Sequence, residues 1–435
     1  MMTRATAPRL ISLVCRRLYS HVRTAGESPM SWATAEVGRY GSMQAAVPSA
    51  PISLSHLTRR PQDSFLSLQL PFASDAQLRE AYLSFEGQLR VGKLLEDIDA
   101  FAGAIAHRHC RVGEDAAQPM LMTVSTDRVD LLQYPLHPQQ DLVMRGCVAH
   151  VGSSSLGVEI DVAGAGGAVL LRASLTMVAR QPGGQGALAV PRLAASTPAE
   201  AALCAAGARA SEARRAARQV AMARAPPTSE ELQMVHTLWH ERGASPPHEA
   251  ARAPLVSTEL TQPTDKNVNG HIFGGWLMRK AYETAWAAGW QATGSPPQFL
   301  AMDDVLFASP VELGSLLSFT GSLTFAPGAP HRTYGITVVV TMSRRGAPGT
   351  AAAPQLLPPI VTNTMHFTFH SGDLAFPPRM LPQSYSEAMA YIEAHRRDAA
   401  GRELAERRRS QGGARPRFSD EGVVGEGGQE GGDIV

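Results

Sequence analysis

The chain carries the same pattern twice: an apolar helical segment is followed by segments in which apolar side chains alternate with polar or small ones. The first helical segment follows Gly92 and the second follows Gly275. Examples of the alternating positions are Leu156, Val158, Ile160 and Val162 in the first half, and Tyr334, Ile336, Val338 and Val340 in the second. Apolar spacing near 3.6 residues predicts a helix, and a period of two predicts strands. We therefore expect an α+β fold in which each half is an antiparallel sheet wrapped round a central helix.

Length and local composition divide the chain into five segments. With 435 residues it exceeds one ordinary domain. The stretch from residue 197 is rich in Ala, Arg and Glu, which favours helix, and the end of the chain is dense in charge and glycine. The predicted segments are a presequence at 1–24, a first unit at 60–185, a helical connector at 186–245, a second unit at 246–395 and a disordered tail at 396–435.

The N-terminus has the composition of a mitochondrial presequence. Five arginines occur before Glu27, which is the first acidic residue of the chain. An Arg-rich and acid-free leader is typical of import into mitochondria, and the apolar run within it is too short for a secretory signal. We therefore expect residues 1–24 to direct the protein to the mitochondrial matrix.

The overall charge and the cysteines exclude several classes of function. The formal net charge is +1, which indicates no nucleic-acid-binding surface. The four cysteines lie far apart, without a C-x-x-C pair, so no zinc site or disulfide framework is encoded. No apolar run reaches the roughly 18 residues that a membrane span needs. We therefore expect no metal, no cofactor, no nucleic-acid partner and no membrane span.

The segment from Asn267 to Gly275 is the strongest candidate for chemistry. Gly274 and Gly275 open an apolar helix, and the carboxamide of Asn267 precedes them by a few residues. The start of a helix offers unpaired backbone N–H groups and a partial positive charge, and glycines allow a carbonyl oxygen to approach them closely. Such a corner can hold the oxyanion that forms when a thioester is attacked.

These residues resemble the N-x-x-G-x-x-[HF]-G-G segment of hotdog-fold acyl-CoA thioesterases, and in particular the mitochondrial acyl-coenzyme A thioesterase 9 group. A second block, Asp303 to Phe307, resembles the strand that follows the helix in that group, and the resemblance covers roughly residues 64–392. It implies a tandem hotdog fold, hydrolysis of acyl-CoA to free fatty acid and coenzyme A, substrate contacts at Gly270, Phe273 and Gly274, and a homo-oligomer of tandem chains.

The catalytic carboxylate is expected in the first unit. At about 100° per residue, Glu283 falls opposite the buried face of the second helix, whereas Tyr282 lies on its flank. In the first helix Glu96 points away from the core, and Asp99 occupies the place of Tyr282 when Gly92 and Gly275 are taken as equivalent. The resemblance implies that the carboxylate stands at this position.

The two units are therefore expected to share one composite active site. The first unit has the acid but no Asn-x-x-Gly or Gly-Gly corner, and the second has the corner but not the acid. In the predicted mechanism Asp99 is the general base or the nucleophile, Asn267 orients the water or the carbonyl, and the Gly275 N–H donates to the oxyanion.

Two other functions stay open at this point. One is a hotdog hydratase or dehydratase acting on acyl-CoA, because Asp265, Asn267 and His271 approach a hydratase signature, although with the spacing off by one. The other is a non-catalytic acyl-CoA-binding module. Release of free thiol from acyl-CoA distinguishes hydrolysis from both.

Overall fold

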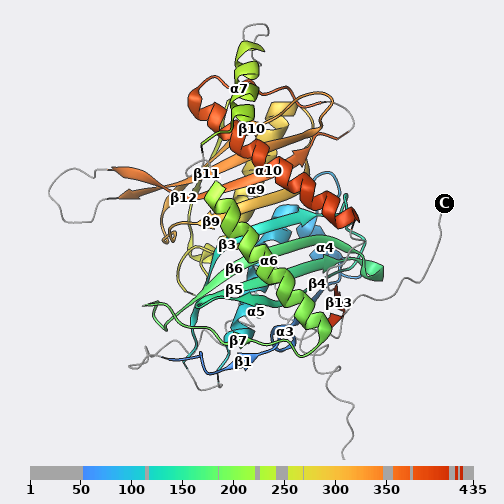
Figure 1. The fold of residues 1–435 in the computed structure, drawn as a ribbon, viewed down its shortest axis with the longest axis vertical. Helices are drawn as coiled ribbons and strands as arrows, with labels where there is room; N and C mark the ends of the chain where they lie inside the picture. The colour runs from blue at the N-terminus through green and yellow to red at the C-terminus, as the bar shows by residue number, and fades with distance from the viewer. Residues whose placement is uncertain are drawn as a thin grey trace, which may run out of the picture.

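The computed structural model describes residues 52–112, 117–184, 186–220, 226–241, 253–267, 269–345, 356–372, 376–410, 417–419 and 422–424. The predicted presequence at 1–24 lies outside these residues. The central feature is one ten-stranded sheet in the order β2-β4-β5-β6-β3-β9-β12-β11-β10-β8 (Figure 1). Its strands are β2 (Leu66–Leu70), β3 (Met120–Leu131), β4 (Leu142–Val151), β5 (Ser155–Ala163), β6 (Val169–Arg180), β8 (Leu255–Leu260), β9 (Gln298–Phe307), β10 (Leu316–Phe325), β11 (Thr333–Arg345) and β12 (Leu356–His370).

The two halves of this sheet are copies of one unit, related by a local twofold axis. β3 and β9 pair antiparallel at the centre, and from them the order outward is β6, β5, β4, β2 on one side and β12, β11, β10, β8 on the other. The carbonyls of Leu136 and Val311 accept equivalent hydrogen bonds, from Leu89 and Ile272. Leu136 follows Arg128, and Val311 follows Asp303, at the same spacing. Because Arg128 stands opposite Asp303 in the β3–β9 register, the axis passes between these two residues.

Each half encloses one long helix. Helix α5 (Val91–Cys110) and helix α9 (Gly274–Thr293) have 20 residues each. They lie against each other, and each packs on the strands of its own half. One face of each helix and the inner face of the sheet share a single apolar core that runs through both units. A helix wrapped by an antiparallel sheet is the hotdog architecture, so the predicted tandem hotdog fold is confirmed.

The glycines at the starts of the two helices let them approach closely. A Cβ on Gly275 would lie 2.8 Å from the carbonyl oxygen of Glu96, and a Cβ on Gly92 would lie 3.2 Å from Cγ of Arg279. Glu96 and Arg279 each lie four residues after the glycine of their own helix. The contacts are therefore reciprocal, and the helices run antiparallel about the same axis as the sheet.

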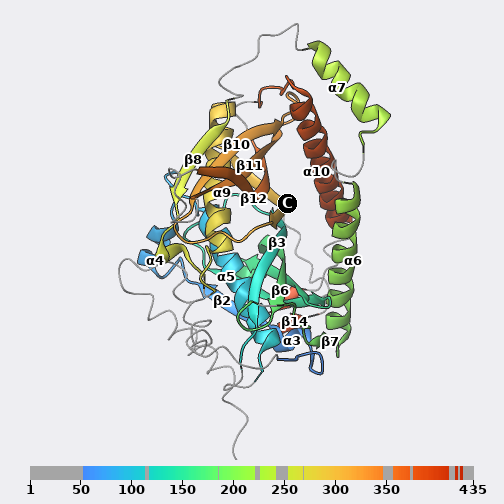
Figure 2. The ribbon, with the colours of Figure 1, turned by 90° about the vertical axis from the view of Figure 1, so that its left-hand side faces the viewer.

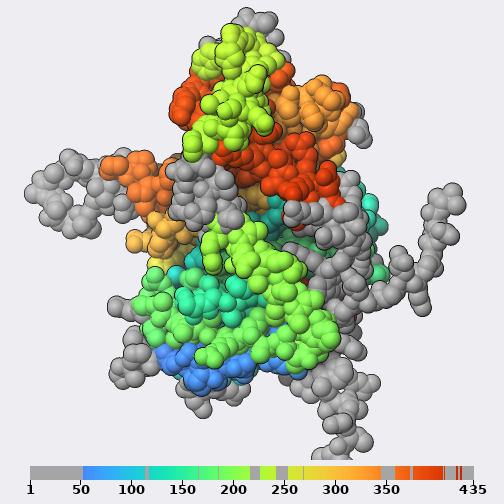
Figure 3. Space-filling view, in the orientation of Figure 1, coloured from blue at the N-terminus to red at the C-terminus, as the bar shows by residue number. Residues whose placement is uncertain are grey.

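Two further helices cover the outer face of the sheet. Helix α6 (Pro198–Val220) packs on β4 and β5, and helix α10 (Tyr385–Ser410) packs on β10. Figure 2 shows both on the side away from α5 and α9, and Figure 3 shows how they cover this face. Helix α7 (Ser229–Glu241) joins the units, and its Glu231 pairs with Arg396 of α10. The short elements are β1 (Thr58–Arg59), α3 (Pro61–Ser64), α4 (Ala76–Tyr82), β7 (Arg192–Leu193), β13 (Arg417–Ser419), β14 (Gly422–Val424) and the 3-10 turns η1 (Ala165–Gly167) and η2 (Pro263–Asp265).

The prediction of a disordered tail from residue 396 is wrong for its first part. Helix α10 continues to Ser410, and Phe418 of β13 packs against Phe65 of the first unit. Charge density suggested disorder, but in a helix it supplies pairs four residues apart, such as Arg397 with Glu393. The first unit also extends beyond the predicted limits of 60 and 185, because β1 pairs in parallel with β7.

Candidate functional site

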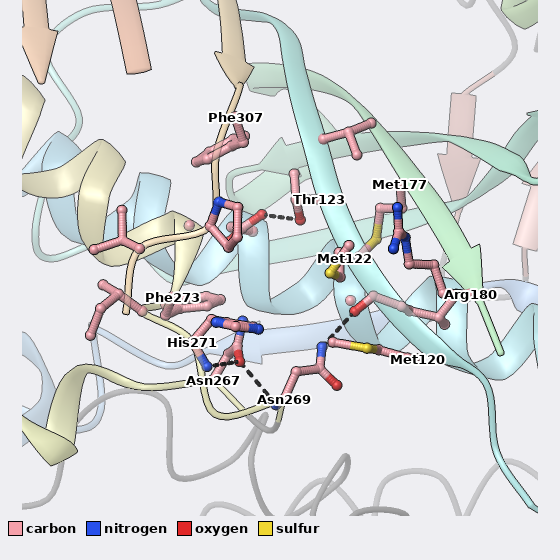
Figure 4. Close-up of a pocket in the computed structure, with 18 of the residues that line it drawn as sticks. Met120, Met122, Thr123, Met177, Arg180, Asn267, Asn269, His271, Phe273 and Phe307 are labelled. Carbon is pink, nitrogen blue, oxygen red and sulfur yellow. Dashed lines mark hydrogen bonds between the residues drawn. The ribbon is translucent and has the colours of Figure 1, made fainter. Parts of the chain in front are cut away.

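A pocket of about 450 Å³ lies at the seam between the two units, beside the start of α9. The first unit contributes Asp99 from α5 and Thr123 from β3, and the second contributes Asn267, Phe273 and Gly274. Figure 4 shows the β3 side chains facing the Asn267 loop across this pocket. The predicted acid and the predicted corner are thus brought together from positions far apart in the sequence.

Asp99 is held at the start of α9 by two hydrogen bonds. The Thr123 hydroxyl donates to Oδ1 over 2.7 Å, and the backbone N–H of Gly275 also donates to this carboxylate. Burial raises the pKa of Asp99 to about 6, the hydrogen bonds from Thr123 and Gly275 lower it, and the nearby Glu96 raises it. A carboxylate with this pKa is ionised at pH 8 and is more basic than an exposed aspartate.

The Asn267 loop presents an amide to the pocket. The side-chain oxygen of Asn267 accepts from the backbone N–H groups of Asn269, at 2.9 Å, and His271, at 3.2 Å. Because both of these backbone groups are donors, the Oδ1 atom of Asn267 must face the loop. Its Nδ2 group can then donate to a ligand in the pocket. Gly270 closes the loop with a φ of +83° and donates its N–H to the Asn267 carbonyl.

The predicted site residues divide into two groups. Asp99, Asn267, Phe273 and Gly274 line the pocket, whereas Gly270 shapes the loop and Gly275 lies behind it in the helix contact. A Cβ on Gly274 would lie 3.0 Å from Oδ2 of Asp99, so a side chain at this position would press on the carboxylate. The Gly275 N–H, expected to donate to an oxyanion, donates to Asp99 here.

Several residues of the pocket were missed by sequence reasoning. Thr123 belongs to no motif, and only its hydrogen bond to Asp99 reveals it. Asn269 donates from Nδ2 to the Leu121 carbonyl over 2.9 Å, which ties the loop of the second unit to β3 of the first. The remaining wall is flexible and apolar, with Met120, Met122 and Met177 beside Arg180. The methionines on alternate positions of β3 were a signal that the sequence analysis did not use.

The expectation that Glu96 points away from the core is wrong. Glu96 is only 3% exposed, and its Oε2 lies 2.8 Å from Nη1 of Arg279. The helical phase argument assumed one buried face, but α5 is covered by the sheet on one side and by α9 on another. Glu283 lies away from Asp99, where its carboxylate accepts from Arg90 over 2.7 Å.

No cluster of three potential metal ligands occurs within the described ranges. In the same part of the chain, no helix combines the length and apolar character needed to cross a membrane.

A hotdog pair with a buried carboxylate, a loop amide and a helix N-terminus around one seam pocket defines the class of hotdog thioester hydrolases. No family model matches the sequence. The chain is 31% identical over 354 residues to human mitochondrial acyl-coenzyme A thioesterase 9, which covers 78% of this chain and 77% of the human protein. It is also 31% identical over 342 residues to chloroplastic acyl-coenzyme A thioesterase 2 of Humulus lupulus, covering 74% of this chain and 75% of that protein. The chain therefore belongs to the acyl-coenzyme A thioesterase family.

Solved structures with similarity include an acyl-CoA hydrolase from Staphylococcus aureus, at 20% identity and a TM-score of 0.33, covering 43% of this chain and 99% of that one. Another is the 12:0-ACP thioesterase of Umbellularia californica, at 9% identity and a TM-score of 0.43, covering 71% of this chain and 95% of that one.

Proposed function

We propose that the seam pocket hydrolyses acyl-CoA thioesters to free fatty acid and coenzyme A, with Asp99 as the catalytic carboxylate. The observation that carries this proposal is the position of the Asp99 carboxylate, which lies in a pocket at the start of α9 beside the Asn267 amide. Glu283, the competing acid, lies outside this pocket and pairs with Arg90. Its charge is therefore offset by a neighbouring cation.

Two routes use the same carboxylate. As general base, Asp99 takes a proton from water while the water oxygen attacks the thioester carbon, and the proton then goes to the departing sulfur as the C–S bond breaks. As nucleophile, a carboxylate oxygen of Asp99 attacks the carbon and the C–S bond breaks to release the thiolate, which takes a proton from solvent; water then cleaves the resulting anhydride and restores the Asp99 carboxylate. Both routes require the ionised form of Asp99, so both predict loss of rate as the pH falls through its pKa.

Asn267 is proposed to act on the carbonyl rather than on water as an acceptor. Its side-chain oxygen is already used by two backbone N–H groups, so the Nδ2 group is its remaining polar end. A donor aimed at the thioester oxygen stabilises the negative charge that develops there. The Gly275 N–H can donate to the thioester oxygen as well only if that oxygen displaces the Asp99 carboxylate, to which the N–H now donates. Phe273, Gly274 and the loop glycine Gly270 are proposed to position the substrate.

The finer location and assembly are also proposals. Relatives from human, cow and mouse carry mitochondrial names, and the Arg-rich leader at 1–24 supports import into the matrix. N-terminal sequencing of organelle-derived protein should begin near Ser20 or somewhat later, and an intact Met1 would contradict this. A homo-oligomer is supported by the exposed apolar side chains of Val256 and Leu260 on the edge strand β8 and of Leu316 on its neighbour β10, and light scattering on the purified chain tests it.

Release of free thiol from a panel of acyl-CoAs, from short to long, tests the proposed reaction. Thiol release by the wild-type chain that disappears in Asp99→Asn supports hydrolysis at this pocket. A change in enoyl absorbance without thiol release would favour the hydratase alternative. Saturable binding with neither signal would favour a binding module.

A further inference from the structure

A second pocket, of about 410 Å³, lies beside the start of α5, where the local twofold axis places the counterpart of the seam pocket. It is lined by the loop Leu83–Leu89, by the first residues of α5 and by Tyr282 of α9. Tyr282 lies against Gly92 in the same way as Asp99 lies at the start of α9. The two pockets therefore occupy equivalent places in the two units.

The loop that borders this second pocket repeats the hydrogen bonds of the Asn267 loop. The Ser84 N–H donates to the Gln88 carbonyl over 2.7 Å, as the Asn267 N–H does to His271. The Ser84 hydroxyl oxygen accepts from the Gln88 N–H at 3.2 Å, as Oδ1 of Asn267 does from His271 at 3.2 Å. The first unit therefore repeats the loop conformation of the Asn267 corner, although Val91 stands where the second unit has Gly274.

The turn glycine and the flanking bridge are repeated as well. Gly87 has a φ of +74° where Gly270 has +83°, and its N–H donates to the Ser84 carbonyl. The antiparallel bridge between Leu83 and Leu89 matches the bridge that closes the Asn267 loop. The loop that borders the pocket is thus built twice, with a serine in place of the asparagine in the first unit.

The side chains facing the second pocket differ in a consistent way. Tyr282 stands where the seam pocket has Asp99, and Trp286 stands where it has Gly103. Tyr134 replaces Ser309, next to equivalent prolines. These changes leave no carboxylate in the place of Asp99 and add three aromatic side chains, while Glu86 lines the pocket in the place of Asn269. Glu283 also lines the pocket, but its carboxylate accepts a hydrogen bond from Arg90 at 2.7 Å.

We propose that this second pocket binds an acyl thioester without hydrolysing it, and that its aromatic walls select a short or flat acyl group. The inference rests on the proposed function, because the ligand class is taken from the equivalent pocket. Its size is within the range of small-molecule sites, and aromatic walls with a few polar groups are typical of them. Trp286 lines this pocket where the seam pocket has Gly103, and we expect its ring to reject a long acyl chain.

Binding stoichiometry on the full-length chain tests this proposal. The probe is S-butyl-coenzyme A, a thioether that cannot be hydrolysed, titrated by calorimetry into the wild-type chain. We expect two molecules bound per chain with different affinities. S-hexadecyl-coenzyme A should bind at no more than one site, because the second pocket rejects a long chain. One S-butyl site per chain would overturn the proposal.

Trp286→Ala locates the second site. It should weaken one of the two affinities at least tenfold and leave thiol release from acyl-CoA within about twofold of wild type. Trp239→Ala, the same substitution on α7, is the matched control and should change neither. If Trp286→Ala does not fold, Tyr134→Ser serves instead, since it places the residue type of Ser309 in the second pocket. Two sites that both survive these substitutions would contradict the assignment.

The outcomes separate this inference from the proposed function. Thiol release together with a single binding site per chain would reject ligand binding at the second pocket and leave the proposed hydrolysis intact. Two binding sites per wild-type chain without thiol release would reject the proposed hydrolysis and leave ligand binding at the second pocket intact. Tighter binding of a free aromatic acid than of S-butyl-coenzyme A at the Trp286-sensitive site would reject the thioester as its ligand.

Discussion

Glu96 and Arg279 occupy equivalent positions on the two central helices and form an ion pair across the local twofold axis, with 2.8 Å between Oε2 and Nη1. A second pair, Arg128 with Asp303, spans the same axis between β3 and β9. If two copies of the same unit paired about this axis, each of these charged residues would lie opposite an identical residue of the same charge. The two units are therefore complementary, and the charges favour the pairing of one unit with the other.

Reversing the helix pair tests this complementarity. Glu96→Arg or Arg279→Glu alone should destabilise the fold by about 3–5 kcal/mol, because each leaves a poorly solvated charge opposite a like charge. The double substitution Glu96→Arg with Arg279→Glu should recover most of that loss. Thermal unfolding of the four proteins measures the coupling. Additive effects in the double variant would show that the two residues do not act as a pair.

Asp99→Asn should lower turnover by about 10²–10⁴-fold while leaving affinity for a thioether analogue nearly unchanged. The amide keeps the packing but cannot take a proton or attack the thioester. Glu283→Gln is the matched control and should retain most activity, since Glu283 lies outside the seam pocket. Near wild-type turnover in Asp99→Asn, with loss in Glu283→Gln, would place the catalytic acid in the second unit.

The same Asp99→Asn variant should be more stable than wild type at pH 8. Burial raises the folded pKa of Asp99 from 3.8 to about 6, so the folded state binds this proton more tightly than the unfolded state. The resulting stability is present below pH 3.8 and is lost as the pH rises through 6. Ionised Asp99 then costs up to about 3 kcal/mol, which the neutral amide avoids. A lower melting temperature for Asp99→Asn at pH 8 would contradict this.

The pH dependence of kcat/KM should report the environment of Asp99. The rate should fall below about pH 6, where Asp99 takes up a proton. Thr123→Val removes a hydrogen bond that lowers the pKa of Asp99, so the acid limb should move to higher pH. Thr258→Val, on the exposed edge strand β8, should leave the profile unchanged. An acid limb that stays in place in Thr123→Val would show that another group controls it.

Separately expressed units should be inactive and poorly soluble. Separation exposes β3 and β9 as unpaired edges, uncovers the contact between α5 and α9, and divides Asp99 from Asn267. Thiol release and solubility of residues 52–220, which keep α6 on the first unit, and of residues 226–410, alone and mixed, measure this. Full activity of the second unit alone would reject the composite site.

Much of this molecule was predictable because its signals are local. The alternation of apolar residues predicted the strands, and the glycines before each apolar segment marked the starts of α5 and α9. The candidate site was predictable in part, since the family resemblance implied a carboxylate at one position of the helix and the spacing from Gly92 placed Asp99 there. Thr123 did not, because a threonine in a strand has no distinguishing pattern until the fold places it 2.7 Å from a carboxylate.

The features that the sequence analysis predicted wrongly depend on contacts between elements that are distant in the sequence. A helix buried on two sides cannot be recognised from one period of apolar residues, so Glu96 was assigned to solvent. The equivalent loop of the first unit was overlooked because Ser84 and Asn267 share a hydrogen-bonding role but not a residue type. Similarly, charge in α10 was taken for disorder, although it pairs along the helix and with Glu231.

The sequence by itself determined the repeat, the two central helices, the strands and the glycine corner at Gly274, because backbone propensity and apolar periodicity act between near neighbours. Only the tertiary structure decided which groups hold the Asp99 carboxylate at that corner, what sets its pKa and which charges pair across the axis. Those features arise from contacts between residues of different units, such as Asn269 with Leu121, which are 148 positions apart. Their energies depend on burial and distance, which exist only after the two units have docked.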